Sequence, residues 1–393
     1  MTGVVSRTGE SASSVPAVAG SGLRLVFLAN SVARGGAETQ LVRAAVGLAE
    51  RGHRVTVARM LDWPGHEDDL AAAGIPLVEL PARRPVRAAS ALTAGALLLR
   101  RLRPHAVVSF DYQANLLGRL AGRAAGVPAV VSSIRADRFG GAPREWWIRR
   151  TDGLAAVTTT NAARVARRLV ERGLVHPDRL VVIPNAVDDV APVDADTRAR
   201  VRGELAIAPD EFVFLALGHI APRKDHATML RAAARARRAG SAFRLLIAGD
   251  GDTSPLADLA GALGITADVH LLGWRDDVAD LLAASDALVS SSAWEGTPNA
   301  AIEALMREVP VVATRAGGTE EVVEDEVSGF LVDVGDWRAL ADRLARTCAL
   351  PAATRAAMGA HGQAHVRARH DRERVLDQWE ALLQRVTVDA VRG

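Results

Sequence analysis

Short apolar runs alternate with helix-like patterns along almost the whole chain. Such runs, bounded by turn residues, are typical of strands in parallel sheets, and the longer segments with apolar residues at helical spacing are typical of the helices between them. The first half predicts strands at Arg24–Ala29, Arg54–Ala58, Ile75–Leu80, Ala106–Ser109, Ala129–Ser133, Leu154–Thr158 and Leu180–Ile183. The second half predicts strands at Phe212–Leu217, Phe243–Ala248, Val269–Leu272, Ala287–Ser290, Val309–Ala313 and Gly329–Val332. The pattern therefore predicts an α/β protein with two doubly wound, Rossmann-like parallel sheets.

A linker is expected between the two sets of strands, because Pro184 to Ala195 carries Pro, Asn and several Asp without any periodicity. It separates a first domain, 23–188, from a second, 189–370. The pattern stays helical near the end of the chain, and 371–388 is long enough to pack back onto the first domain. Residues 1–22 are expected to form a flexible tail, since they lack the apolar block of a signal peptide. Two facing sheets of this kind place the carboxyl ends of their strands around a central crevice, where ligands bind.

The composition narrows the class of protein. A hydrophobic fraction of 49% and a charged fraction of 24% exclude a disordered chain of 393 residues. The single cysteine, Cys348, excludes an internal disulfide and a multi-cysteine metal site, and it suits a reducing compartment. No apolar run reaches the roughly 18 residues of a membrane-spanning helix. We therefore expect a cytoplasmic protein.

The net charge of +2 conceals an asymmetry between the two halves. Residues 1–200 carry 27 Arg against 18 acidic residues, whereas 201–393 carry 21 basic against 28 acidic residues. A basic half of this kind suits an anionic partner or surface. Its densest part surrounds the apolar stretch 92–99 with Arg83, Arg84, Arg87, Arg100, Arg101 and Arg103. This segment fits either a basic amphipathic helix on anionic lipid, at the inner face of the membrane, or an ordinary solvated helix.

Two further counts bear on partners. Aromatic residues make up only 4% of the chain, which leaves few stacking platforms and disfavours a nucleic acid partner. Of the 48 basic residues, Lys224 is the only lysine. A compact ammonium group differs chemically from a planar guanidinium, so this position is expected to need a lysine.

The first candidate motif, 30–38, follows the first predicted strand and precedes a helical pattern. Gly35 and Gly36 allow the backbone to approach a ligand closely, and the helix N-terminus offers free N–H groups to an anion. The second motif, 217–225, has the same position in the second domain. Arg223 and Lys224 lie just before a predicted helix, so their charges and the helix dipole would converge on the same phosphate oxygens.

The third motif, 291–306, is the most specific. Thr297 and Pro298 fit the N-cap and the first position of a helix, which places Glu295 in the loop and Glu303 within the helix. One carboxylate can then reach one end of an extended ligand while the other reaches the opposite end, with the helix N-terminus between them facing a phosphate. Two carboxylates also suit a glycosidase, but the neighbouring phosphate-type loops would then have no purpose.

With these motifs the chain resembles the family-4 glycosyltransferases, which are retaining enzymes of the GT-B fold. The segments 182–188, 248–251 and 317–321 add to the resemblance, which covers nearly the whole chain after Gly22. It implies a nucleoside-diphosphate sugar of the UDP or GDP type as co-substrate, with no metal or other cofactor. It also implies that Glu295 lies by the donor sugar, that Glu303 holds the ribose hydroxyls, and that the amides of 296–299 hold the sugar and diphosphate. The implied donor-binding residues are Gly35, Gly36, Gly218, His219, Arg223, Lys224, Gly249, Trp274, Arg275, Glu295, Gly296, Thr297, Pro298, Asn299 and Glu303.

The chain departs from the family at two points. His219 stands where the family usually has an arginine beside the phosphate lysine, and Arg223 is a candidate to supply that charge. Arg135 stands where a histidine often follows the fifth strand, and it could bind an anionic acceptor or the diphosphate. Asp111, after the fourth strand, could orient an acceptor hydroxyl. The expected catalytic residues are therefore Glu295, Lys224, Arg135 and Asp111.

Nearby aromatic and acidic residues receive simpler interpretations. Trp274 and Arg275 could edge the nucleobase, whereas Trp294 is expected to pack in the core. The acidic pairs at 188–189 and 276–277 fit helix starts and loops better than metal ligands.

The expected activity is transfer of a hexosyl-type sugar, with retained configuration, to a glycan, a lipid-linked saccharide or a small metabolite. The crevice should be a positively polarised cradle for the diphosphate, which gains charge as it leaves. A non-catalytic subunit that binds a sugar nucleotide remains an alternative, because His219 and Arg135 depart from the family pattern. A GT-B epimerase of nucleotide sugars is a second alternative, although it needs an acid–base set around the sugar.

Overall fold

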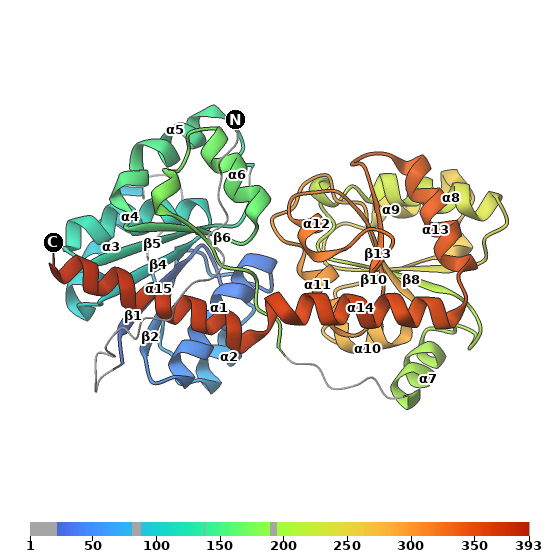
Figure 1. The fold of residues 1–393 in the computed structure, drawn as a ribbon, viewed down its shortest axis with the longest axis horizontal. Coiled ribbons are helices and arrows are strands. Elements are labelled where there is room, and N and C mark those ends of the chain that lie inside the picture. Colours follow the sequence, from blue (N-terminus) through green and yellow to red (C-terminus); the bar gives the residue numbers. More distant parts are fainter. Residues whose placement is uncertain (1–21, 81–87, 137, 189–194, 393) are drawn as a thin grey trace.

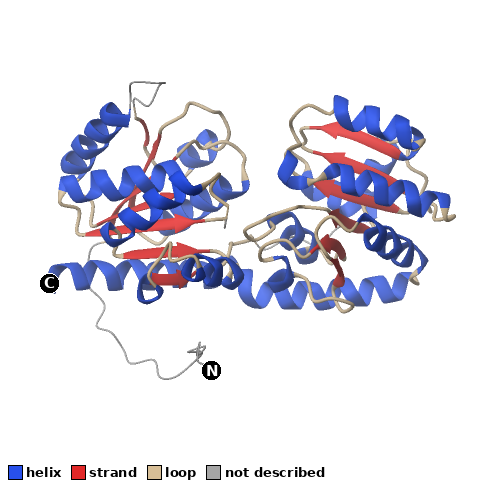
Figure 2. Ribbon diagram, turned by 90° about the horizontal axis from the view of Figure 1, so that it is seen from above, coloured by secondary structure: helices blue, strands red, loops and turns tan. Residues whose placement is uncertain are grey.

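The computed structural model describes residues 22–80, 88–136, 138–188 and 195–392. Two parallel β-sheets stand side by side, and helices cover the faces of each (Figure 1; Figure 2). The first sheet has seven strands in the order β3-β2-β1-β4-β5-β6-β7, and the second has six in the order β10-β9-β8-β11-β12-β13. The two doubly wound sheets predicted from the apolar pattern are therefore confirmed. The predicted tail, 1–22, lies outside the described residues except for Gly22.

The first domain alternates strands and helices in a regular order. Its strands are β1 (Arg24–Ala29), β2 (Arg54–Arg59), β3 (Leu77–Glu79), β4 (Ala106–Phe110), β5 (Ala129–Ile134), β6 (Val157–Thr160) and β7 (Leu180–Val182). Its helices are α1 (Gly36–Glu50), α2 (Glu67–Ala72), α3 (Ala88–Leu102), α4 (Tyr112–Ala125), α5 (Ala142–Thr151) and α6 (Ala163–Glu171), with 3-10 turns η1 (Asp152–Leu154) and η2 (Pro177–Arg179).

The second domain repeats this alternation. Its strands are β8 (Val213–Leu217), β9 (Arg244–Ala248), β10 (Val269–Gly273), β11 (Ala287–Ser290), β12 (Val311–Thr314) and β13 (Gly329–Val332). Its helices are α7 (Ala195–Glu204), α8 (His226–Arg238), α9 (Ser254–Leu263), α10 (Val278–Ala284), α11 (Asn299–Met306), α12 (Thr319–Val322), α13 (Trp337–Ala349) and α14 (Ala352–His370), with 3-10 turns η3 (Pro222–Lys224) and η4 (Thr266–Asp268). The last helix is α15 (Arg372–Arg392).

One predicted strand, Leu154–Thr158, is displaced along the chain. Its first residues belong to the turn η1, and β6 begins only at Val157. The cause is the buried Asp152 at the start of that turn. Its carboxylate accepts hydrogen bonds from the His176 backbone N–H (3.1 Å) and the Thr158 hydroxyl (3.2 Å), so the chain turns toward these partners before the strand starts.

The last helix returns to the first domain. Figure 1 shows α14 on the second domain and α15 on the first, end to end along one side of the molecule. Helix α15 packs against α1, and Trp379 stacks on Phe110 of β4 with ring centroids 5.9 Å apart. The contact with α1 is close, since a Cβ on Gly47 would lie 2.4 Å from Leu376 Cδ1. The helix thus belongs to the core of the first domain.

The candidate lipid-binding helix is α3, and its apolar side faces inward. Leu99 is 1% exposed, and Leu92 and Leu98 pack against the same cluster beneath α4. Gly95 lies against Leu117 and Ala121 of α4. Of the two interpretations of this helix, the packing favours the ordinary solvated helix, because Leu92, Leu98 and Leu99 pack beneath α4, although Leu97 of the same stretch is 59% exposed. Arg83, Arg84 and Arg87 lie outside the described residues.

Two segments connect the domains, and they run side by side. The Val187 backbone N–H donates to the His370 carbonyl (2.9 Å), and Val187 forms a parallel bridge with Asp371. The His370 ring nitrogen Nδ1 donates to the Asn185 carbonyl (2.8 Å). Burial lowers the pKa of His370 to about 4, despite the hydrogen bond to Asn185, so this contact involves a neutral ring at neutral pH. Of the predicted linker, 189–194 lie outside the described residues.

Candidate active site

A cavity of about 820 Å³ lies between the domains, at the carboxyl ends of strands from both sheets. A ligand site is expected in this position of a doubly wound fold. All the predicted site residues except Pro298 line it. They are Gly35, Gly36, Asp111, Arg135, Gly218, His219, Arg223, Lys224, Gly249, Trp274, Arg275, Glu295, Gly296, Thr297, Asn299 and Glu303. The structure thus brings together motifs more than 250 positions apart in the sequence.

The centre of the cavity is a cluster of charges around Glu295. Lys224 Nζ lies 2.5 Å from Glu295 Oε1, and Arg223 Nη1 lies 3.4 Å from Oε2. The Ser292 hydroxyl donates to Oε1 (2.8 Å). Burial raises the pKa of Glu295, but the charges of Lys224 and Arg223 outweigh it and leave the pKa below its ordinary value. The carboxylate is therefore ionised and fixed in place.

The loop before α11 is held by the first domain. Thr297 does not cap the helix, as the sequence predicted: α11 begins at Asn299 with Pro298 at the N-cap, and the Thr297 hydroxyl donates to the Asn161 carbonyl (2.8 Å). Gly296 packs against the same domain, since a Cβ there would lie 2.0 Å from the Arg135 carbonyl oxygen. The prediction was wrong because the partner of Thr297 belongs to a distant segment. Asn299 and Ala300, the first residues of α11, still line the cavity.

A bridge of two asparagines crosses the cleft. Asn185 Nδ2 donates to Asn299 Oδ1 (2.5 Å), and Asn299 Nδ2 donates to the Gly36 carbonyl (3.1 Å). Asn185 Oδ1 also accepts a hydrogen bond from Arg135. Asn299 therefore connects the N-terminus of α11 to the glycine loop of the first domain, Gly35 and Gly36, across the cavity. Sequence reasoning did not assign Asn185 to the site, although it noted the segment around it.

Glu303 lies on α11, eight residues after Glu295, and lines the same cavity. Burial is the main cause that raises its pKa, against the nearby charges of Arg43 and Arg307. Arg43 Nη2 lies 4.0 Å from Glu303 Oε1. The two acids and Lys224 therefore face a single connected space.

The first-domain side of the cavity holds Arg135 and Asp111. Arg135 is 8% exposed, and its guanidinium lies 5.2 Å from the centre of the Phe110 ring. Its Nε has no hydrogen-bond partner among the described residues. Burial lowers the pKa of Arg135 to about 10, and burial raises the pKa of Asp111 despite the charges of Arg135 and Arg223. At neutral pH the arginine carries its charge.

Glu38 is a cavity residue that sequence reasoning missed. Burial, together with the charge of Asp111, raises the pKa of Glu38 to about 7. Its side chain lies over the glycine loop, because a Cβ on Gly35 would lie 2.4 Å from Glu38 Oε2. Gly35 thus makes room for this carboxylate. Glu38 closes the first motif, directly at the start of α1, but nothing in the local sequence sets it apart from an ordinary helix-start acid.

The rim of the cavity in the second domain carries the remaining predicted residues. Gly218 has φ = 128°, and a Cβ on Gly249 would lie 2.0 Å from the Gly218 carbonyl oxygen, so both positions require glycine. His219 Nδ1 pairs with Asp250 Oδ1 (2.6 Å). Trp274 is 52% exposed, and Arg275 Nε donates to Asp277 (2.7 Å). Neither of these side chains is committed to the protein core.

The positively polarised cradle expected from the sequence covers only part of the cavity, because acidic side chains line it as well. Its lining includes seven Lys or Arg residues and seven Asp or Glu residues. The positive charge is instead local, at Lys224 and Arg223 beside Glu295 and at Arg135 on the facing wall. Among the described residues, no group of three or more His, Cys, Asp or Glu is placed to hold a metal ion.

A side cavity of about 270 Å³ adjoins the main one and shares Asp111 and Arg135 with it. Arg138 and Arg144 also line it; Arg138 lies 4.8 Å from the centre of the Trp294 ring, and Arg144 lies 5.3 Å from that of Tyr112. Trp294 is half-buried and lines the main cavity, so the prediction that it packs in the core was wrong. Its ring instead contacts the Arg138 guanidinium.

Two family models match the chain. The model described as "Glycosyltransferase Family 4" matches residues 34–190, and the one described as "Glycosyl transferases group 1" matches residues 197–365. Together they extend over most of the chain and meet between the two sheets.

Curated relatives match over part of their lengths. A UDP-Gal:alpha-D-GlcNAc-diphosphoundecaprenol alpha-1,3-galactosyltransferase of Escherichia coli is 29% identical over 63% of this chain and 67% of its own. A lipopolysaccharide core biosynthesis glycosyltransferase of Rhizobium meliloti is 28% identical over 61% and 64%. A D-inositol 3-phosphate glycosyltransferase of Mycobacterium sp. is 35% identical over 49% and 47%. The chain thus spans from about half to two thirds of these relatives.

Solved structures match almost throughout. Anabaena HepE, solved in complex with UDP-glucose, has a TM-score of 0.82 and 22% identity, covering 92% of this chain and 99% of that one. WaaG, a glycosyltransferase involved in lipopolysaccharide biosynthesis, has a TM-score of 0.70 and 19% identity, covering 90% and 98%. The expected GT-B fold is confirmed. No helix in the described ranges has the length and apolar character needed to cross a membrane.

Proposed function

Because this chain belongs to the family-4 glycosyltransferases, we propose that it transfers a hexose from a nucleoside-diphosphate sugar to an acceptor with retention of configuration. The observation that carries the proposal is the convergence of Lys224, Glu295 and Glu303 on one cavity at the carboxyl ends of both sheets. UDP is the favoured nucleotide, since HepE was solved with UDP-glucose and the galactosyltransferase of Escherichia coli is named for UDP-Gal.

The donor would lie across the second domain. Glu303 accepts hydrogen bonds from the ribose hydroxyls, and Glu295 contacts the sugar. The N-terminus of α11 binds the diphosphate together with the glycine loop of the first domain, Gly35 and Gly36. Departure of the sugar leaves negative charge on the diphosphate, and Lys224 and Arg223 are fixed donors beside it. Such preorganised groups are commonly the largest catalytic contribution, with a single donor worth about 2.7–4 kcal/mol. The departing phosphate oxygen takes the acceptor proton on the same face, so no separate nucleophile is required.

The acceptor would enter from the first domain. Arg135, Arg138 and Arg144 give the side cavity a positive wall, which suits a phosphate-bearing acceptor. Two relatives carry phosphorylated acceptors in their names, a diphosphoundecaprenol and an inositol phosphate. We therefore favour a phosphorylated or lipid-linked acceptor over a neutral metabolite, with Asp111 orienting the hydroxyl that attacks. This reaction belongs to the cytoplasmic side of the membrane.

Lys224→Ala tests the proposal. We expect kcat/KM for transfer from UDP-glucose or UDP-galactose to fall by about two to three orders of magnitude, with the circular dichroism spectrum unchanged. Arg231→Ala is a matched control, because Arg231 is an exposed cation on α8 away from the cavity. Wild-type turnover in Lys224→Ala would contradict the role of this residue.

The anomeric configuration of the product, read by NMR, tests retention separately. Binding of UDP without any transfer or donor hydrolysis would favour the non-catalytic subunit. An epimerised sugar nucleotide would favour the epimerase.

A further inference from the structure

Two neighbouring tryptophans on α5 are exposed on the surface of the first domain. Trp146 is 50% exposed and Trp147 is 47% exposed, and their rings meet edge to face with centroids 4.9 Å apart. Arg149 and Arg150 follow directly on the same helix and are also exposed. Two adjacent half-exposed indoles form an apolar patch, which on a soluble domain commonly marks an interaction site. We call Trp146, Trp147, Arg149 and Arg150 the tryptophan ridge.

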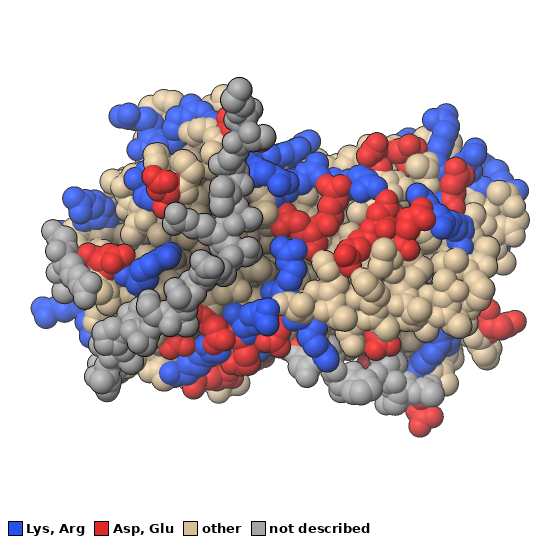
Figure 3. Space-filling view, in the orientation of Figure 1, with Lys and Arg blue, Asp and Glu red and all other residues tan. Residues whose placement is uncertain are grey.

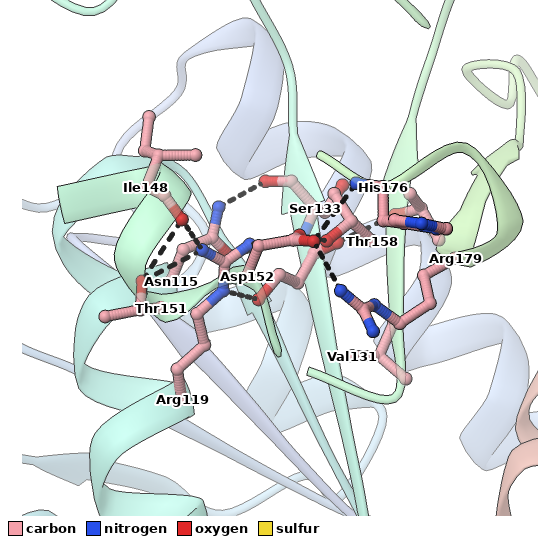
Figure 4. A network of polar contacts seen from close by, with 12 residues as sticks. Asn115, Arg119, Val131, Ser133, Ile148, Thr151, Asp152, Thr158, His176 and Arg179 are labelled. Atoms are coloured by element: carbon pink, nitrogen blue, oxygen red, sulfur yellow. Dashed lines mark hydrogen bonds and ion pairs between the residues drawn. The ribbon is translucent and has the colours of Figure 1, made fainter. Parts of the chain in front are cut away.

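The inner side of α5 is already fully engaged, so the ridge has no role in the core. Ile148 is 4% exposed and packs against Val165 and Leu169 of α6. Beneath it lies the buried Arg119 of α4, whose Nη1 donates to the Ile148 carbonyl and to the Thr151 hydroxyl, both at 3.1 Å (Figure 4). The helix is therefore fixed from below, and the two indoles cannot turn inward without breaking this network.

The same network ties α5 to the sheet. Arg119 Nε donates to the Ser132 hydroxyl of β5 (2.9 Å), and Nη2 donates to the Thr158 hydroxyl of β6 (3.2 Å). On its outer side, Arg149 donates to the carbonyls of Arg172 and Gly173 at the end of α6, both at 2.9 Å. These hydrogen bonds hold α5, and with it the tryptophan ridge, in one orientation.

The surroundings of the ridge are strongly basic. Residues 142–172 carry seven arginines and three acids. Of these acids, Asp152 is buried and Glu145 is paired with Arg172. Figure 3 shows Lys and Arg side chains gathered over α5 and α6, with few acidic side chains among them. The charge and the exposed apolar surface therefore coincide.

From this coincidence we propose that the tryptophan ridge docks the protein on an anionic phospholipid surface. Indole rings are favoured at the level of the lipid headgroups, where their apolar body and N–H group are both satisfied. Arginines beside them are attracted by anionic headgroups. An apolar protein partner would instead bury the charge of Arg150 without an acidic partner, at a cost.

The geometry also relates the docked surface to the side cavity. Arg144 and Ile148, one turn apart on α5, line that cavity, while the tryptophans between them point outward. Docking would therefore bring the side cavity next to the lipid surface. Only this consequence depends on the proposed function; the docking itself does not.

Co-flotation of the full chain with phosphatidylcholine vesicles, with and without phosphatidylglycerol, tests the proposal. We expect binding only when the anionic lipid is present, weakened by added sodium chloride. Trp146→Ala combined with Trp147→Ala should weaken binding by roughly tenfold or more, and Arg150→Glu by roughly tenfold. Trp63→Ala is the matched control, because Trp63 is 58% exposed on the same domain but lies beside the acidic start of α2.

The outcomes separate clearly. Equal binding by the wild type and the double variant, or no binding of the wild type to anionic vesicles, would overturn the proposal. A wild-type dimer in light scattering that the double variant loses would also overturn it, in favour of a second copy as the partner. UDP affinity should be the same in wild type and double variant, so failure of the ridge would leave the proposed function untouched.

Discussion

Replacing Glu38 by glutamine should remove a pH dependence from the stability of the first domain. The pKa of Glu38 is raised from 4.5 to about 7 by burial and by the charge of Asp111. Below pH 4.5 the carboxyl is neutral in the folded and the unfolded protein alike. As the pH rises toward 7, the folded protein holds the proton more tightly than the unfolded chain, so the free energy of unfolding falls. Above pH 7 the loss is complete.

The size of the effect follows from the two pKa values. The interval from 4.5 to about 7 corresponds to about 3 kcal/mol, at about 1.4 kcal/mol for each pH unit. Solvent screening of the half-buried side chain reduces this to about 2 kcal/mol. Glutamine is neutral at every pH and keeps the shape of the side chain. Relative to the wild type, Glu38→Gln should thus be nearly neutral at pH 4.5 and more stable by about 2 kcal/mol at pH 8.

Hydrogen exchange of the slow amides in β1 and α1 is the appropriate measurement, because it reports opening of the first domain without requiring both domains to unfold together. The matched control is Glu171→Gln, which alters an exposed glutamate on α6 of the same domain. Asp111→Asn should lower the pKa of Glu38 and give part of the same effect. A stability difference between Glu38→Gln and wild type that stays constant from pH 4.5 to 8 would refute the reasoning.

Three further substitutions probe the cleft and its support. Gly296→Ala places a Cβ 2.0 Å from the Arg135 carbonyl oxygen, so the two domains must move apart at this contact. UDP affinity, measured by calorimetry, should then fall by about tenfold. Gly153→Ala, where a Cβ meets no atom within 4 Å, should leave the affinity unchanged. Glu303→Gln should weaken UDP binding by about tenfold while the melting temperature holds, and unchanged affinity would count against the ribose contact. Arg119→Met should destabilise the first domain by about 3 kcal/mol in urea, since it removes the donor to the buried Ser132 hydroxyl and to the Ile148 carbonyl, and the cation 3.7 Å from the buried Asp152.

Most strands were predictable because they are short apolar runs buried between two helical layers, as in β1, β4, β5, β8 and β9. Such a run needs no information from elsewhere in the chain. The errors arose where a side chain has a distant partner. Thr297 looks like an N-cap in its local sequence, but Asn161 takes its hydroxyl. The start of β6 shifts because Asp152 binds the backbone of His176.

In the candidate site, too, the features set by local sequence were predicted and those that depend on distant residues were missed. Residues directly after strands were predicted to meet, because parallel strands of one sheet end at the same edge. Glu38 was missed since its role depends on burial beside Asp111, which no local pattern reveals. The apolar stretch 92–99 suited a lipid surface as well as a neighbouring helix, and only the structure shows that α4 covers most of it while Leu97 stays exposed. The tryptophans of α5 carried no helical apolar period and so gave no signal.

Asn185 lies on one of the two segments that connect the domains and also lines the cavity between them. Its carbonyl accepts from His370 on the second connecting segment, while its side chain contacts Arg135 on the first domain and Asn299 on the second. A rotation about the connecting segments must therefore change the distances among these groups. Because Asn299 begins the helix that carries Glu303, any such rotation also moves the N-terminus of α11 relative to the glycine loop. In the proposed function, binding of the diphosphate would therefore be coupled through one side chain to a rotation of the domains. Asn185→Ala should accordingly weaken UDP binding even though Asn185 itself need not touch the nucleotide.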